Sequence, residues 1–411
     1  MSSTITLDRL RSAVTGDAAI RCRTRLTPAG GPSDKVFPAT YDGGKYATEF
    51  RRVDGQEVPC AVLDSVQSQA NRMEEQLLDL WERGRIQLPI VSVDFASAGL
   101  ADVPKVTSLD APHRIFDAIL RDSLLGDAPL PDSEVGQKLE SFSIANATPL
   151  FEHCPTALLF GAWNSTGKRG GSGAKVARSI VSEIVAFGTA TGVRSGSRLD
   201  PLAIAADVTV YASADGLGWT TDESSATRDG KKPKLFSGSG DKPGRPSLLN
   251  HGNVTPSLEE GKGGVSLDFA EQTTVLSLGS LRKLRFPIDG TRSPKTDDAA
   301  RSVLAALGLV AAAALRKAGC DLRSRCTLVP ESAGSWELLD GNGSDPEAID
   351  VDLDGSLALF EAAVDAARAA GLPWSSDELV LTPSPELCSL VTESRRREAE
   401  KARAGASGSG T

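Results

Sequence analysis

The segment AAIRCRTRLT (18–27) alternates strictly between two kinds of side chain. One face holds small or apolar groups, and the other holds Arg21, Arg23 and Arg25. A period of two predicts a strand with one buried face. Neighbouring arginines repel one another unless an anion lies close by, so the exposed face is a candidate contact for a polyanion. A solvated face without a ligand is the alternative interpretation.

Other strands and helices follow on both sides of this segment in no regular order. Further strands are predicted at 58–64, 88–95, 157–163, 203–212, 273–279 and 281–288, and helices at 64–84, 110–125, 174–187, 298–317 and 356–370. The helix at 64–84 has Asp64 or Ser65 as its N-cap and Gly84 at its end. Because strands and helices mix without a βα repeat, an α+β fold is favoured over a doubly wound sheet.

The composition of the 411 residues is that of an ordinary globular protein, with 40% hydrophobic and 24% charged residues and a net charge of −9. The length suggests two or three structural units. The longest apolar stretch, 304–315, is too short for a membrane span of roughly 20 residues. The N-terminus has no signal-peptide core, and the six cysteines form no CxxC pair. We therefore expect a cytoplasmic protein without a membrane segment, a zinc site or a cofactor.

Charge is distributed unevenly along the chain. Residues 331–386 hold 13 acidic residues and a single basic one, Arg368. Basic residues dominate two other stretches, 161–198 and 228–245. This asymmetry fits a protein that contacts a polyanion with one surface and another protein, or water, with the other. Solvated charge without any partner is an equally weighted alternative.

The segment GAWNSTGK (161–168) resembles a phosphate-binding P-loop but fails on spacing. Five residues separate Gly161 from the Gly-Lys pair where a Walker loop has four, and Arg169 replaces the magnesium-binding Ser or Thr. ATP hydrolysis is therefore not expected. The glycine-rich backbone with Lys168, Arg169 and Lys175 still predicts an anion cradle, with a basic surface turn as the alternative. Lys175 and Arg178 share one side of the helix predicted at 174–187.

The sequence contains no arrangement typical of a catalytic or metal site. The three histidines are far apart, and no HxH, HExxH or GxSxG motif is present. His113 and Arg114, at the start of a predicted helix, either contact phosphate or cap that helix. Trp163 either stacks on a base or belongs to the core. The residues alone thus predict a protein with basic elements suited to a phosphodiester backbone.

Several long strings resemble one family. They are RLTPAGGPSDKVFPATY (25–41), LDSVQSQANRMEE (63–75), TSLDAPHRIFDAILRDS (107–123), CPTALLFGAWNSTGKRGGSGAKVARSIVSEI (154–184) and SRLDP (197–201). The chain resembles the CRISPR-associated RAMP backbone subunit, in the version found in type I-G (formerly I-U) Cascade complexes. The likeness covers most of residues 7–210.

This resemblance implies a modified RRM or ferredoxin-like core with thumb and finger insertions. It also implies a non-catalytic protein whose copies stack head to tail on a CRISPR guide RNA, beside other Cascade subunits. Each copy would hold the sugar–phosphate backbone while the bases pair with target DNA. The corresponding domains are a core at 1–212, a mobile basic insertion at 213–264, a core completion with acidic helices at 265–392 and a disordered tail at 393–411.

By matching position, the resemblance places RNA contacts at two elements. These contacts are Gln67, Ser68, Asn71 and Arg72 at the first helix, and Ser165, Thr166, Lys168 and Arg169 in the glycine-rich loop. The charge argument adds Arg21, Arg23 and Lys35. Two alternatives stay open. One is a RAMP ribonuclease acting on guide or target RNA through Asp34 or His113, and the other is a general single-strand-binding protein.

Overall fold

The computed structural model describes residues 3–164, 175–216, 218–238 and 242–407. Within them the chain divides into two compact units. Unit 1 comprises residues 1–191 and 264–387, and unit 2 comprises residues 192–263 and 388–411. The excursion out of the first unit thus begins at Gly192, which corrects the boundary predicted at 213.

A ten-stranded sheet, counted over the described residues, forms the centre of unit 1. Its order is β1 (Ser3–Thr4), β26 (Glu347–Asp350), β25 (Ser335–Leu339), β2 (Ala19–Pro28), β22 (Phe269–Ser277), β13 (Ile180–Phe187), β6 (Gln56–Asp64) and β5 (Thr48–Val53). The hairpin of β23 (Cys320–Arg323) and β24 (Cys326–Pro330) joins it at β2. All pairs are antiparallel except β1 with β26.

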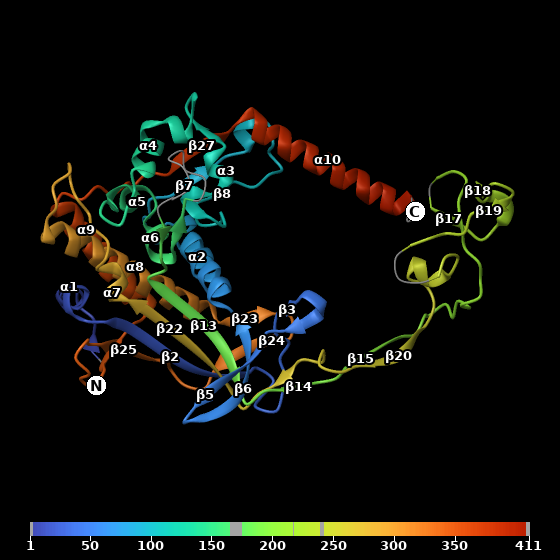
Figure 1. The fold of residues 1–411 in the computed structure, drawn as a ribbon, viewed down its shortest axis with the longest axis horizontal. Helices are drawn as coiled ribbons and strands as arrows, with labels where there is room; N and C mark the ends of the chain where they lie inside the picture. The colour runs from blue at the N-terminus through green and yellow to red at the C-terminus, as the bar shows by residue number, and fades with distance from the viewer. Residues whose placement is uncertain (1–2, 165–174, 217, 239–241, 408–411) are drawn as a thin grey trace. The chain divides into compact units, whose positions relative to one another are not determined.

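Two long helices cover one face of this sheet (Figure 1). They are α2 (Val66–Glu82), which packs on β13, and α8 (Pro294–Ala318), which packs on β22. α8 approaches β22 closely at Gly308, where a Cβ atom would lie 3.2 Å from the Leu276 side chain. α1 (Leu7–Gly16) and α9 (Leu353–Ala369) pack on the far side of α8. α7 (Leu278–Leu281) links β22 to the segment before α8. The Arg316 guanidinium of α8 donates to the sulfur of Cys22 in β2, whereas Leu26 of β2 packs in a cluster with residues of β23 and β24.

A smaller sheet and several short helices complete unit 1. The sheet has the order β10 (Ala128–Pro129), β9 (Ser123–Leu125), β27 (Leu379–Pro383), β7 (Val91–Val93) and β8 (Val106–Thr107). The helices are α3 (Ala118–Arg121), α4 (Glu134–Glu140), α5 (Thr148–His153) and α6 (Pro155–Phe160). Three short antiparallel pairs join β3 (Thr40–Tyr41) with β4 (Lys45–Tyr46), β11 (Ala162–Trp163) with β12 (Lys175–Val176), and β14 (Ala190–Thr191) with β21 (Val265–Ser266).

Unit 2 contains a two-stranded ribbon, further short strands and a helix. The ribbon pairs β15 (Arg194–Arg198) with β20 (Val254–Glu259), and every residue of these two strands is exposed. The other pairs are β16 (Tyr211–Ala212) with β17 (Trp219–Thr220) and β18 (Arg228–Asp229) with β19 (Lys232–Pro233). Helix α10 (Pro385–Ser407) begins in unit 1 and continues into unit 2.

The α+β class is confirmed, as are the helices predicted at 64–84, 298–317 and 356–370. The helix predicted at 174–187 is wrong, because β13 occupies 180–187. Residues four apart share a face in a helix and in a strand alike, so Ile180 and Ile184 satisfied both patterns. The strand predicted at 157–163 is instead helix α6 followed by β11, because a continuous apolar run fits a buried helix equally well.

Four further predictions differ from the structure. The helix at 110–125 breaks at Arg114, whose φ is 53°, and a new short helix starts at the N-cap Asp117. The strand at 203–212 shrinks to β16, and the strand at 281–288 is absent from a fully described segment. The tail predicted as disordered from 393 is helical through Ser407. Residues 213–264 carry short strands within unit 2.

Helix α8 is long and apolar enough to span a membrane by length and composition alone. The buried share of its most apolar window is 89%, which is what the central helix of a folded core shows. Leu304–Leu315, the stretch singled out in the sequence, lies inside α8 and is buried throughout.

Candidate nucleic-acid interface

The hairpin β11–β12 holds two predicted RNA contacts next to each other. Trp163 and Lys175 are directly paired across its two strands, and the lysine Nζ lies 5.8 Å from the indole centroid. The Trp163 side chain is exposed, which rules out a core position. The loop that this hairpin closes carries Ser165, Thr166, Lys168 and Arg169, which lie outside the described residues. An exposed indole beside a lysine suits a base and its phosphate.

Arg114 lies behind this hairpin and is buried. It donates hydrogen bonds of 2.6 Å to both carboxylate oxygens of Glu74 and one of 2.9 Å to the carbonyl of Gly161. Burial raises the pKa of the Glu74 carboxyl, and the Arg114 guanidinium opposes that rise. In this structure the Arg114 guanidinium is occupied by Glu74 and Gly161, and its contact with phosphate stays a prediction. Arg114 ties α2 to the base of β11.

His113 and Arg178 flank the same place. His113 is exposed, and its backbone N–H donates to the Asp117 carboxylate at 3.1 Å. Arg178 Nε donates to the carbonyl of Phe160 at 3.1 Å. Burial and the nearby Arg114 charge lower the pKa of the Arg178 guanidinium below its usual range. Both side chains are placed beside the hairpin, and Arg178 keeps part of its surface accessible.

The first turns of α2 present the polar groups that the resemblance singled out. Ser65 caps the helix by accepting from the N–H of Ser68 at 3.3 Å. Gln67 and Asn71 are exposed and lie one helical turn apart. Glu74, one turn beyond Asn71, is buried against Arg114 and is not part of this exposed surface. Together with the positive end of the helix dipole, the two amides form a surface that can accept a polyanion.

Unlike its exposed neighbours on α2, Arg72 forms an ion pair with a buried carboxylate. Its Nε donates to Asp64 at 3.0 Å, and its Nη2 donates to the carbonyl of Leu322 at 2.6 Å. The Asp64 side chain has no exposed surface and also meets Arg323 at 3.6 Å. Gln69 donates to Asp64 and accepts from Ser182 and Gln272. This network joins α2 to the sheet and to the β23–β24 hairpin.

The arginine face of β2 is neutralised by the protein itself. Arg21 pairs with Glu337 of β25 at 2.7 Å, and Arg23 pairs with Glu271 of β22 at 2.8 Å. Arg25 pairs with Glu331 and lies 3.8 Å from the ring centroid of Phe269. The anion that the sequence demanded is thus supplied by glutamates of neighbouring strands. Repulsion between unpaired arginines was the reason to predict phosphate contacts at Arg21 and Arg23, and these ion pairs remove that repulsion.

Lys35 and Asp34 lie in the loop that follows β2. Asp34 is exposed and accepts a 2.9 Å hydrogen bond from the backbone N–H of Lys35. The Lys35 Nζ lies 5.9 Å from the ring centroid of Phe37. Within the described residues no group of three or more His, Cys, Asp or Glu side chains is arranged to hold a metal ion.

Sequence reasoning missed two arginines of the β23–β24 turn, Arg323 and Arg325. Arg323 lies beside Arg72, and the Arg325 guanidinium lies 4.0 Å from the Phe37 centroid. The signal was present as LRSRC (322–326), a basic pair within a short turn between two apolar residues. It was overlooked because no element had been assigned to residues 318–330. The partners of the β2 arginines were missed since they come from distant strands.

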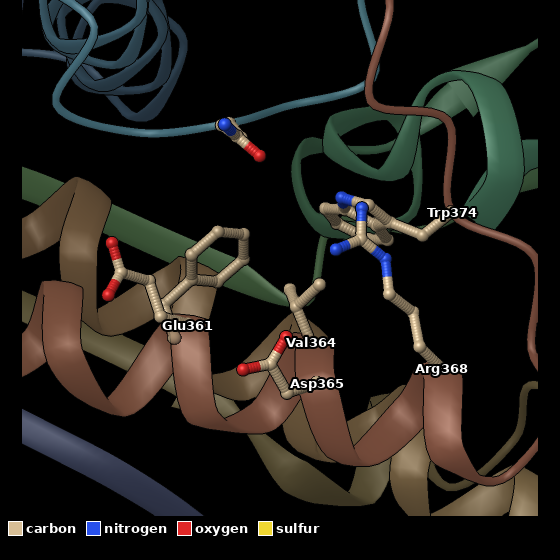
Figure 2. A pocket seen from close by; sticks show the side chains of 7 residues that line it. Glu361, Val364, Asp365, Arg368 and Trp374 are labelled. Atoms are coloured by element: carbon tan, nitrogen blue, oxygen red, sulfur yellow. The ribbon is translucent and has the colours of Figure 1, made fainter.

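A hollow of about 230 Å³ lies along α9, away from these residues (Figure 2). Phe360, Val364 and Trp374 form its apolar wall, and Glu361 and Asp365 lie along its rim with Arg368. Carboxylates at the rim repel phosphate, so this hollow does not belong to the candidate interface.

Residues 20–191 match the family model Cas_GSU0053, described as CRISPR-associated protein GSU0053. The family likeness supports a CRISPR-associated protein. The matched segment runs from β2 through β14 and contains α2 and the β11–β12 hairpin. No curated protein matches the chain.

Among solved structures, the chain is similar to the crystal structure of Thermofilum pendens Csc2. The identity is 12%, the alignment covers 88% of this chain and 90% of that chain, and the TM-score is 0.28. A TM-score this low carries no argument about fold or function. The description of the fold therefore rests on the strand order and helix packing given above.

Proposed function

We propose that the chain is a non-catalytic backbone subunit of a type I Cascade complex, of the I-G version. It binds CRISPR guide RNA, and further copies assemble along that RNA beside other Cascade subunits. The bases of the guide then pair with target DNA, while the protein holds the sugar–phosphate backbone. The observation that carries this proposal is the match of residues 20–191 to a CRISPR-associated family, because the exposed Trp163–Lys175 pair and the first turns of α2 lie inside it.

The order of elements in unit 1 supports an RRM or ferredoxin-like core. Along the chain, β2, α2, β13, β22, α8 and β25 follow as strand, helix, two strands, helix and strand. In the sheet these strands take the order β25, β2, β22, β13, so the last strand lies beside the first. Both helices pack on the same face. This is the split βαβ arrangement, with β6 and β5 added at one edge.

The ribbon β15–β20 supports the assignment of a thumb. It is inserted between the adjacent strands β13 and β22, and the β14–β21 pair closes its base within unit 1. Leu199 and Leu258 of this segment are exposed apolar side chains. Exposed apolar side chains are suited to displacing a base from a stack. Residues 192–263 are the segment to which we assign that role.

The test is RNA binding by the full chain as a function of salt. Replacing both Lys168 and Arg169 by Ala should weaken binding and lower the slope of log affinity against log salt by roughly one to two. The matched control is Lys138→Ala, because Lys138 is already paired with Glu134 within α4. An unchanged slope in the double variant would show that the glycine-rich loop does not bind phosphate. Absence of binding by the wild-type chain at low salt would refute the proposal itself.

A further inference from the structure

Phe37 lies beneath two cationic side chains from distant parts of the sequence. The Arg325 guanidinium carbon is 4.0 Å from its ring centroid, and the Lys35 Nζ is 5.9 Å from the same centroid. Among the described residues neither cation has an ion-pair partner, and both are at least partly accessible. Two like charges held against one ring raise the local potential, and an anion placed between them relieves it.

The ring is fixed in position by backbone pairing on both sides. Val36 exchanges two hydrogen bonds with Val265, of 2.9 and 2.8 Å, and the Phe37 N–H donates to the carbonyl of Arg325 at 2.9 Å. Gly264, with φ of 83°, lies under the ring, where a Cβ atom would come within 3.0 Å of a ring carbon. The backbone pairing therefore holds Phe37 and Arg325 next to each other in the folded chain.

A second pair of arginines adjoins this place. Arg323, two residues before Arg325, donates to the carbonyl of Leu63 at 3.0 Å and shares the buried Asp64 with Arg72. Asp64, which directly precedes the N-cap of α2, neutralises one of these two charges and pairs with both guanidinium groups. The acids on the same segments are Asp34 and Asp321, and Asp321 accepts from the Thr327 hydroxyl at 2.9 Å. Cations thus outnumber acids at this edge.

We propose that Lys35, Phe37 and Arg325 form a site for one nucleotide of single-stranded RNA. The phosphate lies between Lys35 and Arg325, and the base stacks on the Arg325 guanidinium, which Phe37 supports from behind. This inference rests on the proposed function and adds a contact to it. Arg325 lies outside residues 20–191, so the family match does not assign it.

The experiment measures binding of a labelled single-stranded guide RNA to the full chain over a range of salt concentrations. Arg325→Ala should weaken RNA binding by about fivefold or more. A factor of about five corresponds to the smallest loss expected when one stacked base loses its platform. The same substitution should also lower the salt slope by about 0.7, the value for one phosphate contact on a single strand. Phe37→Leu should weaken binding with the slope unchanged, and Arg325→Lys should keep the slope while losing affinity.

The matched control is Arg292→Ala, an exposed arginine of unit 1 that has no ion pair among the described residues. Thermal melting of each variant separates lost binding from lost folding. Wild-type affinity in both Arg325→Ala and Phe37→Leu would overturn the site while leaving the proposed function intact. Loss of association between copies with RNA affinity unchanged would also overturn it, because the surface would then bind protein. Failure of the wild-type chain to bind RNA would refute both.

Discussion

Arginine side chains occupy three different environments in this protein, and each environment gives them a different role. Arg114 is buried with Glu74 and a carbonyl, Arg23 lies on the sheet surface against Glu271, and Arg325 lies on an aromatic ring without a carboxylate among the described residues. The sequence shows all three as basic residues near apolar ones. Which of them meets an anion depends on partners up to 248 positions away, as for Arg23.

At the residue scale, Arg114→Ala should destabilise the fold by about 3–5 kcal/mol, because it leaves the Glu74 carboxylate buried without its partner. Equilibrium denaturation in urea measures this. The control is Arg83→Ala, which removes an exposed pair with Asp79 in α2 and should change stability by less than about 1 kcal/mol. If both variants lost the same small amount of unfolding free energy, the buried Arg114–Glu74 pair would not stabilise the packing of α2 against β11.

The paired and unpaired cations should also differ in RNA binding. Lys175→Ala should lower the salt slope by about 0.7, because a phosphate contact is lost. Arg23→Ala should leave the slope unchanged, since Glu271 already neutralises that charge. Fluorescence anisotropy of labelled RNA against salt gives both values. A slope that falls equally in Arg23→Ala would show that the face of β2 contacts RNA after all.

At the element scale, the segments with explicit end signals were predictable and the others were not. α2 starts at its Ser65 cap, and α8 starts after Ser293 with proline in its first turn and ends at Gly319. β13 lacks such signals, and its apolar spacing suits a helix as well as a strand. Residues 180–187 form a strand rather than a helix because β22 and β6 pair with β13 on both sides. Tertiary pairing of this kind is not visible in a local pattern.

The inserted segment gives a prediction at this scale. Residues 192–263 should be removable, with Thr191 joined to Gly264 through an Asn-Gly turn, because the β14–β21 pair that closes the base lies within unit 1. We expect the shortened chain to melt within a few degrees of the full one and to bind RNA without regular spacing between copies. Nuclease protection of bound RNA measures that spacing. If the shortened chain still protected bound RNA at regular intervals, residues 192–263 would not be the thumb.

At the scale of the whole molecule, an excess of acidic residues is concentrated in one stretch of the chain. The acidic block at 331–386 includes β25, where Glu337 pairs with Arg21, and α9, where Glu361 and Asp365 line the hollow of Figure 2. The sequence predicted the α+β class, which the structure confirms, and a polyanion surface, which stays a prediction. It did not indicate that much of the acidic block is used inside the same chain.

The corresponding prediction concerns catalysis. Complexes of the chain with guide RNA should leave labelled complementary RNA uncut in the presence of divalent metal ions. Asp34→Ala should leave that outcome unchanged, because within the described residues the Asp34 carboxylate accepts a hydrogen bond only from the backbone N–H of Lys35. Gel electrophoresis of the labelled RNA is the measurement. Cleavage by the wild-type complex that disappears in Asp34→Ala would favour the ribonuclease alternative.

The strand order has a consequence for how the chain is made. β2 emerges early from the ribosome, but its neighbours β22 and β25 begin only at Phe269 and Ser335. During synthesis β2 therefore has two open edges, the condition in which strands from different molecules aggregate. Its three arginines then repel one another and similar strands, and so protect the nascent polypeptide. Once Glu271, Glu331 and Glu337 have been synthesised, the same three arginines form ion pairs with them in the folded sheet.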